Sequence, residues 1–321
     1  MDEGQWGVYT DADDVSEQSQ MGRQTKGHTA KTHTTKLDLS GIFRVADIID
    51  DLRDIYKSGL DQGESTGWLK FDSLYRIKKG MMTVVTGIPS SGKSEFVDAL
   101  ATNLAIVKRW KFAVFSPENY PISLHVIKIA EKFIGKQYKS QFEQLSMNRG
   151  EIKDAIAFCG DHFTWIYPDD EREKVNLETI LRKTSVIIEQ TGLDGLIIDP
   201  WNEIESDRNG KSETDYISEC LTKIRRFARK HSIHIWIIAH PQKMQKNKFG
   251  SYDPPTPYDI SGSAHWRNKA DFCICVHRAN LLENKVDVYL QKVKFKHLGK
   301  PGSFQFNYDW MSGRFSEAAQ C

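Results

Sequence analysis

The feature that most constrains this chain is a glycine-rich turn between an apolar strand-like segment and a helix-like one. The turn reads Gly87-Ile-Pro-Ser-Ser-Gly-Lys-Ser94 and follows the apolar run at 81–86. Apolar residues then recur at helical spacing from Glu95 to Lys108. A strand, turn and helix in this order present backbone N–H groups and a helix N-terminus to an anion. The sequence therefore predicts a P-loop within an α/β fold.

The chemistry of this turn predicts which residues bind the nucleotide. Lys93 supplies a positive charge to the β- and γ-phosphates, and the Ser94 hydroxyl reaches Mg²⁺. We expect ATP and Mg²⁺ as the cofactors. The nucleotide contacts expected from this segment are Gly87, Ile88, Pro89, Ser90, Ser91, Gly92, Lys93, Ser94 and Glu95.

Composition limits the class of protein. The 321 residues are 39% hydrophobic, which is enough for a substantial core. Lys plus Arg (44) nearly balances Asp plus Glu (43), so a contact with a polyanion must come from local loops. None of the five cysteines forms a C-x-x-C pair, which favours reduced thiols over a zinc site. Without a long apolar run or a secretory signal, we expect a cytoplasmic protein that spans no membrane.

Three parts of the chain differ in composition. Residues 1–36 are polar with almost no aliphatic side chains, which predicts a disordered leader. Residues 37–66 contain an amphipathic helix near 44–56 and a Gly/Ser/Asp-rich connector. Residues 67–321 alternate strand-like and helix-like segments, which predicts a mainly parallel twisted sheet with helices on both faces.

The alternating strand-like and helix-like segments predict where the individual strands and helices lie. We expect strands near 81–86, 112–116, 163–167, 195–199 and 234–239, and helices near 122–135, 177–191 and 215–231. Three later apolar or alternating runs have little helix between them, and they predict a C-terminal antiparallel extension at 272–277, 286–293 and 302–308.

Polar residues directly after three of these strands are candidates for catalysis, because ligands bind at the carboxyl ends of such strands. Glu118 suits the group that orients or deprotonates an attacking water, although it could instead cap the helix that follows. Asp199 ends an apolar strand in the Walker B form and would hold Mg²⁺ with Ser94. His240 is a candidate γ-phosphate sensor, with a structural histidine as the alternative.

Together these motifs resemble the RecA-like motor domain of hexameric replicative helicases, in the Twinkle-like and phage primase-helicase branch of the DnaB-type family. The resemblance covers about residues 44–316. It is carried, besides the P-loop, by Gly67-Trp68, Asp199-Pro-Trp-Asn202, Ala239-His-Pro241 and Tyr258-Asp-Ile-Ser-Gly-Ser-Ala264. The resemblance implies an ATP-hydrolysing DNA helicase that forms a homo-oligomeric ring, usually of six subunits, around single-stranded DNA. It also implies priming by another chain, a separate primase or loader, since no primase-type segment precedes the motor here.

The resemblance assigns further residues to the nucleotide site. In that family a lysine and an arginine from the next subunit act in trans, and the matching strand here offers Lys292 and Lys294. Lysine lacks the bidentate geometry of arginine, so we expect a weaker finger; a solvated edge strand is the alternative. Arg278 matches a basic position near the phosphates. Tyr308 matches the residue that stacks on the base, with core packing as the alternative.

Two loops are expected to face the centre of such a ring and contact DNA. One carries Arg208 and Lys211, and the other carries Lys243, Lys246 and Lys248. Locally basic loops without base-reading elements suit a sequence-neutral grip on phosphates, although such clusters are also common on solvated surfaces.

The resemblance also suggests a role for the helix near 44–56. In related rings a tethered helix packs on the adjacent protomer, whereas packing on its own domain is the alternative here.

Two other functions are alternatives to a helicase. A RecA-like recombinase or recombination-mediator ATPase would share the P-loop and Asp199. A nucleotide-gated assembly scaffold is the third possibility, because a lysine replaces the finger arginine.

Overall fold

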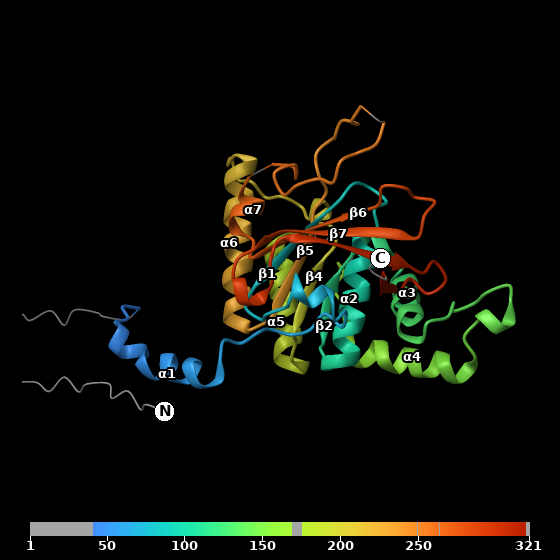
Figure 1. The fold of residues 1–321 in the computed structure, drawn as a ribbon, viewed down its shortest axis with the longest axis horizontal. Helices are drawn as coiled ribbons and strands as arrows, with labels where there is room; N and C mark the ends of the chain where they lie inside the picture. Colours follow the sequence, from blue (N-terminus) through green and yellow to red (C-terminus); the bar gives the residue numbers. More distant parts are fainter. Residues whose placement is uncertain (1–40, 169–174, 249, 263, 319–321) are drawn as a thin grey trace, which may run out of the picture. The chain divides into compact units, whose positions relative to one another are not determined.

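The computed structural model describes residues 41–168, 175–248, 250–262 and 264–318 (Figure 1). The disordered leader expected at 1–36 lies outside these residues. Contacts divide the chain into two units, residues 1–57 and 58–321, which are described separately.

The described part of the first unit is helical. A 3₁₀ turn, η1 (Val45–Ile48), continues into α1 (Ile49–Ser58), so the helix expected near 44–56 is present. The Arg44 N–H donates to the Asp47 carboxylate at 2.7 Å, which closes the first turn. The apolar positions of its stripe are all exposed, and they are Val45, Ile48, Ile49, Leu52 and Ile55.

The second unit is built on one twisted sheet. Within the described residues it has nine strands in the order β3-β2-β4-β5-β1-β6-β7-β8-β9. The parallel strands are β1 (Met82–Thr86), β2 (Phe112–Phe115), β3 (Phe163–Trp165), β4 (Gly195–Ile198), β5 (His234–Ile238) and β6 (Phe272–His277). The antiparallel strands are β7 (Lys285–Val293), β8 (Gly302–Tyr308) and β9 (Phe315–Glu317). The predicted fold class is confirmed.

Helices cover both faces of the sheet (Figure 1). The helices α2 (Lys93–Lys108), α3 (Ile122–Ile134) and α4 (Arg149–His162) contribute to one buried apolar cluster, together with β6–β9. The helices α5 (Leu177–Thr191), α6 (Glu213–His231) and α7 (His265–Lys269) contribute to a second cluster on the opposite face. The central strands are buried on both faces, which explains why they are continuously apolar.

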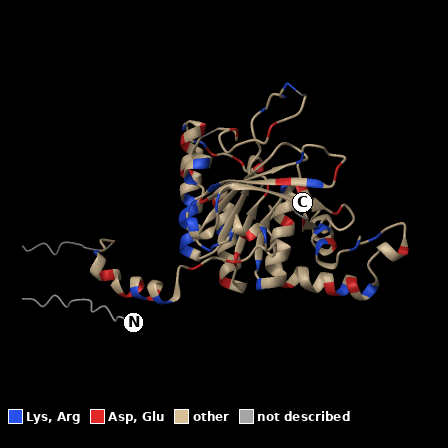
Figure 2. Cartoon of the chain, viewed as in Figure 1, with Lys and Arg blue, Asp and Glu red and all other residues tan. Residues whose placement is uncertain are grey.

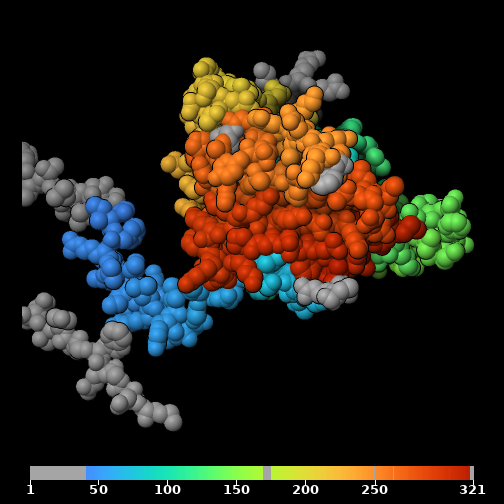
Figure 3. Space-filling model, turned by 45° about the horizontal axis from the view of Figure 1, so that its top comes forward, coloured from blue at the N-terminus to red at the C-terminus, as the bar shows by residue number. Residues whose placement is uncertain are grey.

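Short 3₁₀ turns and the C-terminal strands complete the unit. The turns are η2 (Phe71–Ser73), η3 (Pro117–Asn119), η4 (Glu143–Leu145), η5 (Trp201–Glu203) and η6 (Lys296–Leu298). In the space-filling view the C-terminal segments, orange to red, form a continuous surface (Figure 3). Lys and Arg residues are frequent along α6 (Figure 2).

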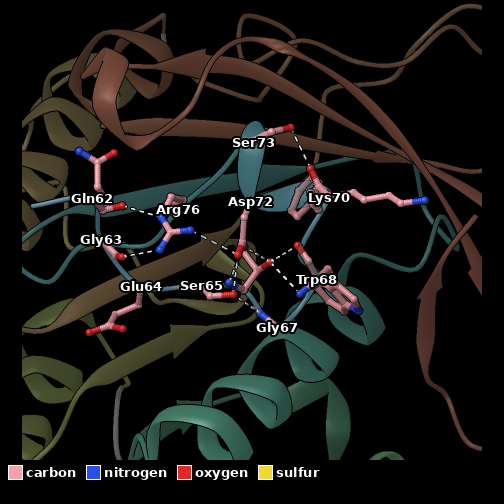
Figure 4. Close-up of polar contacts among 12 residues, drawn as sticks. Gln62, Gly63, Glu64, Ser65, Gly67, Trp68, Lys70, Asp72, Ser73 and Arg76 are labelled. Atoms are coloured by element: carbon pink, nitrogen blue, oxygen red, sulfur yellow. Dashed lines mark hydrogen bonds and ion pairs between the residues drawn. The ribbon is translucent and has the colours of Figure 1, made fainter. Parts of the chain in front are cut away.

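A buried carboxylate fixes the segment that enters the second unit (Figure 4). Asp72 accepts hydrogen bonds from the Thr66 N–H and hydroxyl, both at 2.7 Å, and from the Ser65 hydroxyl. Arg76 lies 3.4 Å from the same carboxylate and donates to the carbonyls of Gln62 and Gly63 at 2.7 and 3.0 Å. We call these contacts the Asp72 clasp. It attaches the chain to the body from residue 62 onward.

The described residues include neither a metal-binding cluster of His, Cys, Asp and Glu side chains nor a membrane-spanning helix. Among the residues described, no group of three or more His, Cys, Asp and Glu side chains is arranged to hold a metal. The described cysteines are buried and form no disulfide, and they are Cys159, Cys220, Cys273 and Cys275. None of the helices in the described part of the chain has the length and apolar character needed to cross a bilayer.

The topology gathers the candidate residues at one edge of the sheet. Parallel pairing aligns the carboxyl ends of β2, β4, β5 and β1, with Phe115 opposite Ile198 and Val85 opposite Ile238. The P-loop, η3, Asp199 and His240 directly follow these four strands. Four separate sequence segments therefore meet where open α/β sheets bind ligands.

Candidate nucleotide-binding site

A cavity of about 680 Å³ opens at this edge. This volume lies within the usual range for small-molecule sites, roughly 300–1,000 Å³. The residues that line it are Pro89, Ser90, Ser91, Gly92, Lys93, Ser94, Glu95, Glu118, Lys128, His240, Arg278, Leu281, Val286, Tyr308, Trp310 and Phe315. Most of the residues that the sequence predicts for the nucleotide site thus line one cavity.

The P-loop takes a shape that requires glycine at its first position. Gly87 has φ +156°, and a Cβ atom there would lie 2.2 Å from the Val276 carbonyl oxygen. Ser90 has φ +63°, and Gly92 has φ +91° as the N-cap of α2. The positive φ values turn the loop so that it leads directly into the N-terminus of α2, whose first N–H groups have no partner within the helix.

Lys93 lies beneath the loop. Its ammonium is buried and donates to the carbonyls of Gly87 and Ile88 at 3.0 and 3.1 Å. Burial lowers the pKa of Lys93, and the negative charges of Asp199 and Glu118 oppose this effect. The amino group is therefore held inside the loop with two carboxylates nearby.

Asp199 and Ser94 form an oxygen donor pair. The Ser94 hydroxyl hydrogen-bonds to the Asp199 carboxyl, which is almost fully buried. Burial raises the pKa of Asp199 to about 7, since a buried carboxylate loses its hydration. A divalent cation would offset that cost. Mg²⁺ is usually bound by one or two carboxylates plus phosphates and waters, so these two residues fit it without a larger metal cluster.

Unpaired polar atoms also surround the loop. Within the described residues, the buried side-chain atoms without a hydrogen-bond partner include Thr86 Oγ1, Ser91 Oγ and His240 Nδ1. Ser91 and His240 line the cavity, and Thr86 ends the strand before the loop. Buried polar atoms are normally hydrogen-bonded, so the unpaired atoms here indicate a polar ligand. The site residues therefore fit a phosphate-bearing nucleotide.

Glu118 and His240 face each other across the cavity. His240 Nε2 lies 3.8 Å from Glu118 Oε1, and the His240 N–H donates to Asn202 Oδ1 at 3.1 Å. Burial lowers the pKa of His240, and the nearby Lys93 charge lowers it further. The imidazole is thus neutral at neutral pH, beside a half-exposed carboxylate that can accept a proton from water.

Arg278, Tyr308 and Trp310 form the other end of the cavity. Arg278 is buried and donates to the Glu283 carbonyl through Nε at 3.1 Å and Nη2 at 2.6 Å. Its guanidinium lies 4.4 Å from the Trp310 ring centroid and 5.7 Å from that of Tyr308. Tyr308 lines the cavity and also packs against the buried apolar cluster. Its surroundings therefore fit both of its expected roles, base stacking and core packing.

The Glu95 side chain lies within the cavity wall but is bound to α3. Its carboxylate contacts Lys132 Nζ at 2.5 Å and Lys128 Nζ at 3.2 Å. Lys132 is almost completely buried. A nucleotide contact by Glu95 would therefore use its backbone N–H in the first turn of α2.

Lys292 and Lys294 lie away from this cavity. Val293 of β7 pairs with Phe272 at the start of β6, whereas the cavity lies beyond the end of β6. Lys292 donates to carbonyls at the C-terminus of α7, those of Arg267 at 2.6 Å and Ala270 at 2.7 Å among them. Lys294 pairs with Asp271 at 3.0 Å. Both ammonium groups have partners within their own chain, and neither reaches its own nucleotide site.

The first predicted DNA loop, which follows β4, has its two cations paired within the chain. Arg208 lies 3.5 Å from Glu213, and Lys211 lies 2.6 Å from Glu219.

The second loop, which follows β5, projects from the body (Figure 1). Pro241 and Ile260 close its base, and Lys246 lies 5.6 Å over the ring of Tyr252. Lys243 and Lys248 belong to the same loop.

Sequence reasoning missed Lys128, Leu281 and Trp310 in the cavity wall, and Tyr252 in the second loop. Trp310 stands two residues after Tyr308, where an alternating strand pattern gives way to a turn, so its spacing was the available signal. Lys128 falls at an ordinary polar position of a predicted helix, and nothing in the sequence distinguishes it.

A family comparison gives an independent result. The family model described as the DnaB-like helicase C terminal domain matches residues 63–317. The chain is 38% identical over 291 residues to the Twinkle homolog protein, chloroplastic/mitochondrial, of Arabidopsis thaliana, which covers 87% of this chain and 40% of that protein. It is 24% identical over 280 residues to the DNA helicase/primase of Enterobacteria phage T3, covering 80% and 47%. The chain thus spans about half the length, or less, of these curated relatives.

Solved structures agree on the fold. A structure described as an ATPase domain superposes with a TM-score of 0.69 at 16% identity, covering 86% of this chain and 99% of that one. A DnaB-like replicative helicase, described with its interactions with primase, gives 0.67 at 16%, covering 85% and 68%. The RadB recombinase gives 0.51 at 15%, covering 79% and 99%. At these identities the superpositions show the fold alone.

Proposed function

The chain belongs to the DnaB-like helicase C-terminal domain family, and on that premise we propose that it hydrolyses ATP and uses the energy to move along single-stranded DNA. The observation that carries the proposal is the convergence of Lys93, Glu118 and His240 on one cavity beside a P-loop, with Asp199 hydrogen-bonded to Ser94 of the cavity wall. These residue types at these positions supply phosphate binding, metal binding, water activation and γ-phosphate sensing.

The roles of the individual residues follow from the geometry. Lys93 would leave its loop carbonyls to bind the β- and γ-phosphates, while the N–H groups of the P-loop surround them. Ser94 and Asp199 would hold Mg²⁺, which when bound neutralises negative charge on the phosphates. Glu118 would orient and deprotonate the attacking water. His240, neutral and within reach of Glu118, would report whether the γ-phosphate is present.

Arg278 and Tyr308 are proposed to bind the rest of the nucleotide. The Arg278 guanidinium is fixed by the Glu283 carbonyl and by two aromatic rings, so its position is set before a ligand binds. The partly exposed Tyr308 and Trp310 rings offer apolar surface for a base.

We propose that Lys292 and Lys294 complete the nucleotide site of a second copy of the chain. They lie at the end of the sheet away from their own cavity, so a catalytic role for them requires a site in another chain of the ring. To do so, Lys294 must exchange Asp271 for a phosphate, and Lys292 must leave three carbonyls. We therefore expect Lys294 to act as a weaker finger than an arginine would, because lysine lacks the bidentate geometry of arginine.

We also propose the loops after β4 and β5 as the single-stranded DNA contacts. They follow β4 and β5, and Asp199 and His240 lie between these strands and the loops, so a change at the γ-phosphate has a short route to the DNA. Arg208 and Lys211 would contact phosphates, as would Lys243, Lys246 and Lys248. We further propose that this motor works inside the cell, as a ring of six copies together with a separate primase or loader. The same proposal divides the chain into a leader (1–36), a linker (37–66) and a motor (67–321).

The test is ATP hydrolysis measured with and without single-stranded DNA, paired with the mass of the assembly in ATP and Mg²⁺. We expect DNA to stimulate turnover and the chain to form a closed oligomer. Turnover that ignores DNA, in a protein that stays monomeric, would leave only a generic P-loop ATPase. A recombinase would form filaments and exchange strands without unwinding, and a scaffold would form rings without hydrolysis.

A further inference from the structure

Lys128 makes a contact that the proposed roles do not use. It lies in α3 and lines the nucleotide cavity. Its ammonium donates to Asn119 Oδ1 at 2.8 Å and lies 3.2 Å from Glu95 Oε1. One side chain thus connects η3 with the first turn of α2.

Each of these two partners stands next to a residue of the proposed chemistry. Asn119 follows Glu118, and Glu95 follows Ser94. The Glu95 carboxylate is itself held at 2.5 Å by Lys132. Lys128 therefore ties the turn that carries the water-activating carboxylate to a fixed point beside the metal-binding hydroxyl.

The turn needs such a tie because packing does little to hold it. η3 has three residues, and none of them is buried. Glu118 of the turn lies 3.8 Å from His240. Within the turn, the Ser116 hydroxyl accepts from Asn119 Nδ2 at 2.8 Å, and the Ser116 carbonyl accepts from the Asn119 N–H at 3.1 Å. These contacts fix the shape of the turn, whereas the bond from Lys128 fixes its distance from α2.

We propose that Lys128 is a positioning residue that sets the place of Glu118 relative to the P-loop through Asn119. This inference rests on the proposed ATP hydrolysis. A displacement of about 1 Å in a catalytic group can lower turnover by about 100-fold. Loss of the tie therefore acts on kcat, while the phosphate contacts that set nucleotide affinity stay intact.

A matched lysine is available as a control. Lys136 lies just after α3, pairs with Glu151 at 2.5 Å, and its side chain is 40% exposed, as is that of Lys128. Its partner belongs to α4, away from the cavity. Lys136→Met thus removes one equivalent surface ion pair without touching η3.

The experiment measures steady-state ATP hydrolysis in the full chain with single-stranded DNA present. We expect Lys128→Met to lower kcat by roughly 10- to 100-fold with KM for ATP changed less than about threefold, because only positioning is lost. Lys128→Arg should recover most of kcat, since it can donate to the same two acceptors. Lys136→Met should match the parent.

A second variant identifies the route. Asn119→Ala should lower kcat to a similar degree, and Lys128→Met combined with Asn119→Ala should be no slower than the worse single variant. Unchanged kcat in Lys128→Met, a rise in KM alone, or losses that multiply in the double variant would each overturn the inference. A parent protein that binds and hydrolyses no ATP would instead overturn the proposed function.

Discussion

Replacing Asp199 by asparagine should stabilise the nucleotide-free protein while it destroys the metal site. The carboxyl is almost fully buried, and burial raises its pKa from the ordinary 3.8 to about 7. Above pH 7 the folded chain must therefore keep a poorly hydrated negative charge. Asparagine keeps the shape and removes the charge.

The magnitude follows from linkage. Each pKa unit between the unfolded and folded states corresponds to about 1.4 kcal/mol. A folded-state pKa near 7 instead of 3.8 costs on the order of 4 kcal/mol at pH 8. Because the folded state binds the proton more tightly, this cost grows as pH rises from about 4 to 7 and is constant above that. At pH 5 roughly 2 kcal/mol remains.

The assay is urea denaturation in EDTA at pH 8 and pH 5, read by tryptophan fluorescence. We expect Asp199→Asn to be more stable than the parent by up to about 4 kcal/mol at pH 8, with the advantage about halved at pH 5. With Mg²⁺ and ATP added, only the parent should gain stability. A variant less stable than the parent at pH 8, or an advantage that does not change with pH, would refute the reasoning.

Asp72→Asn is the matched control, because Asp72 is also a buried carboxylate but has several donors in its clasp (Figure 4). Asparagine would turn an N–H₂ group toward some of these donors. The loss of charge-assisted hydrogen bonds should destabilise this variant by roughly 1.5–3 kcal/mol, the opposite sign to Asp199→Asn.

Three further predictions concern binding and turnover. Gly87→Ala should abolish nucleotide binding in a fluorescent-nucleotide titration, because its Cβ would lie 2.2 Å from the Val276 carbonyl oxygen; retained affinity would show that the loop adopts another shape. Lys294→Ala should lower DNA-stimulated turnover at least about tenfold, and equal turnover would remove Lys294 from the finger role. Lys246→Glu with Lys248→Glu should weaken single-stranded DNA binding in fluorescence anisotropy and flatten its salt dependence, whereas unchanged affinity would place the DNA elsewhere.

Much of the fold was predictable because local signals and burial agree. The central parallel strands β1, β4 and β5 are buried on both faces, so each appears in the sequence as an apolar run followed within two residues by a polar or glycine-rich segment. The P-loop sequence combines a required glycine geometry with phosphate chemistry, and most of the residues predicted for the nucleotide site line its cavity. Residues after strand ends are predictable for the same reason, since topology alone brings them to one edge.

Other elements left weaker signals. α4 contains Gly150 and Gly160 and has little apolar periodicity, and it depends on an Asn148 capping box and on packing against α3. α7 has five residues, and β9 has three. The partners of Lys292 and Lys294, like the bridge made by Lys128, depend on long-range contacts that no sequence spacing encodes.

The most direct test of the account is calorimetric titration of the protein with a slowly hydrolysed ATP analogue in Mg²⁺, in the parent and in Lys93→Ala. We expect one bound nucleotide per chain in the parent and no measurable binding in the variant, because Lys93 is the buried cation of the loop. Equal binding by both proteins, or none by the parent, would contradict the assignment of this cavity as the nucleotide site.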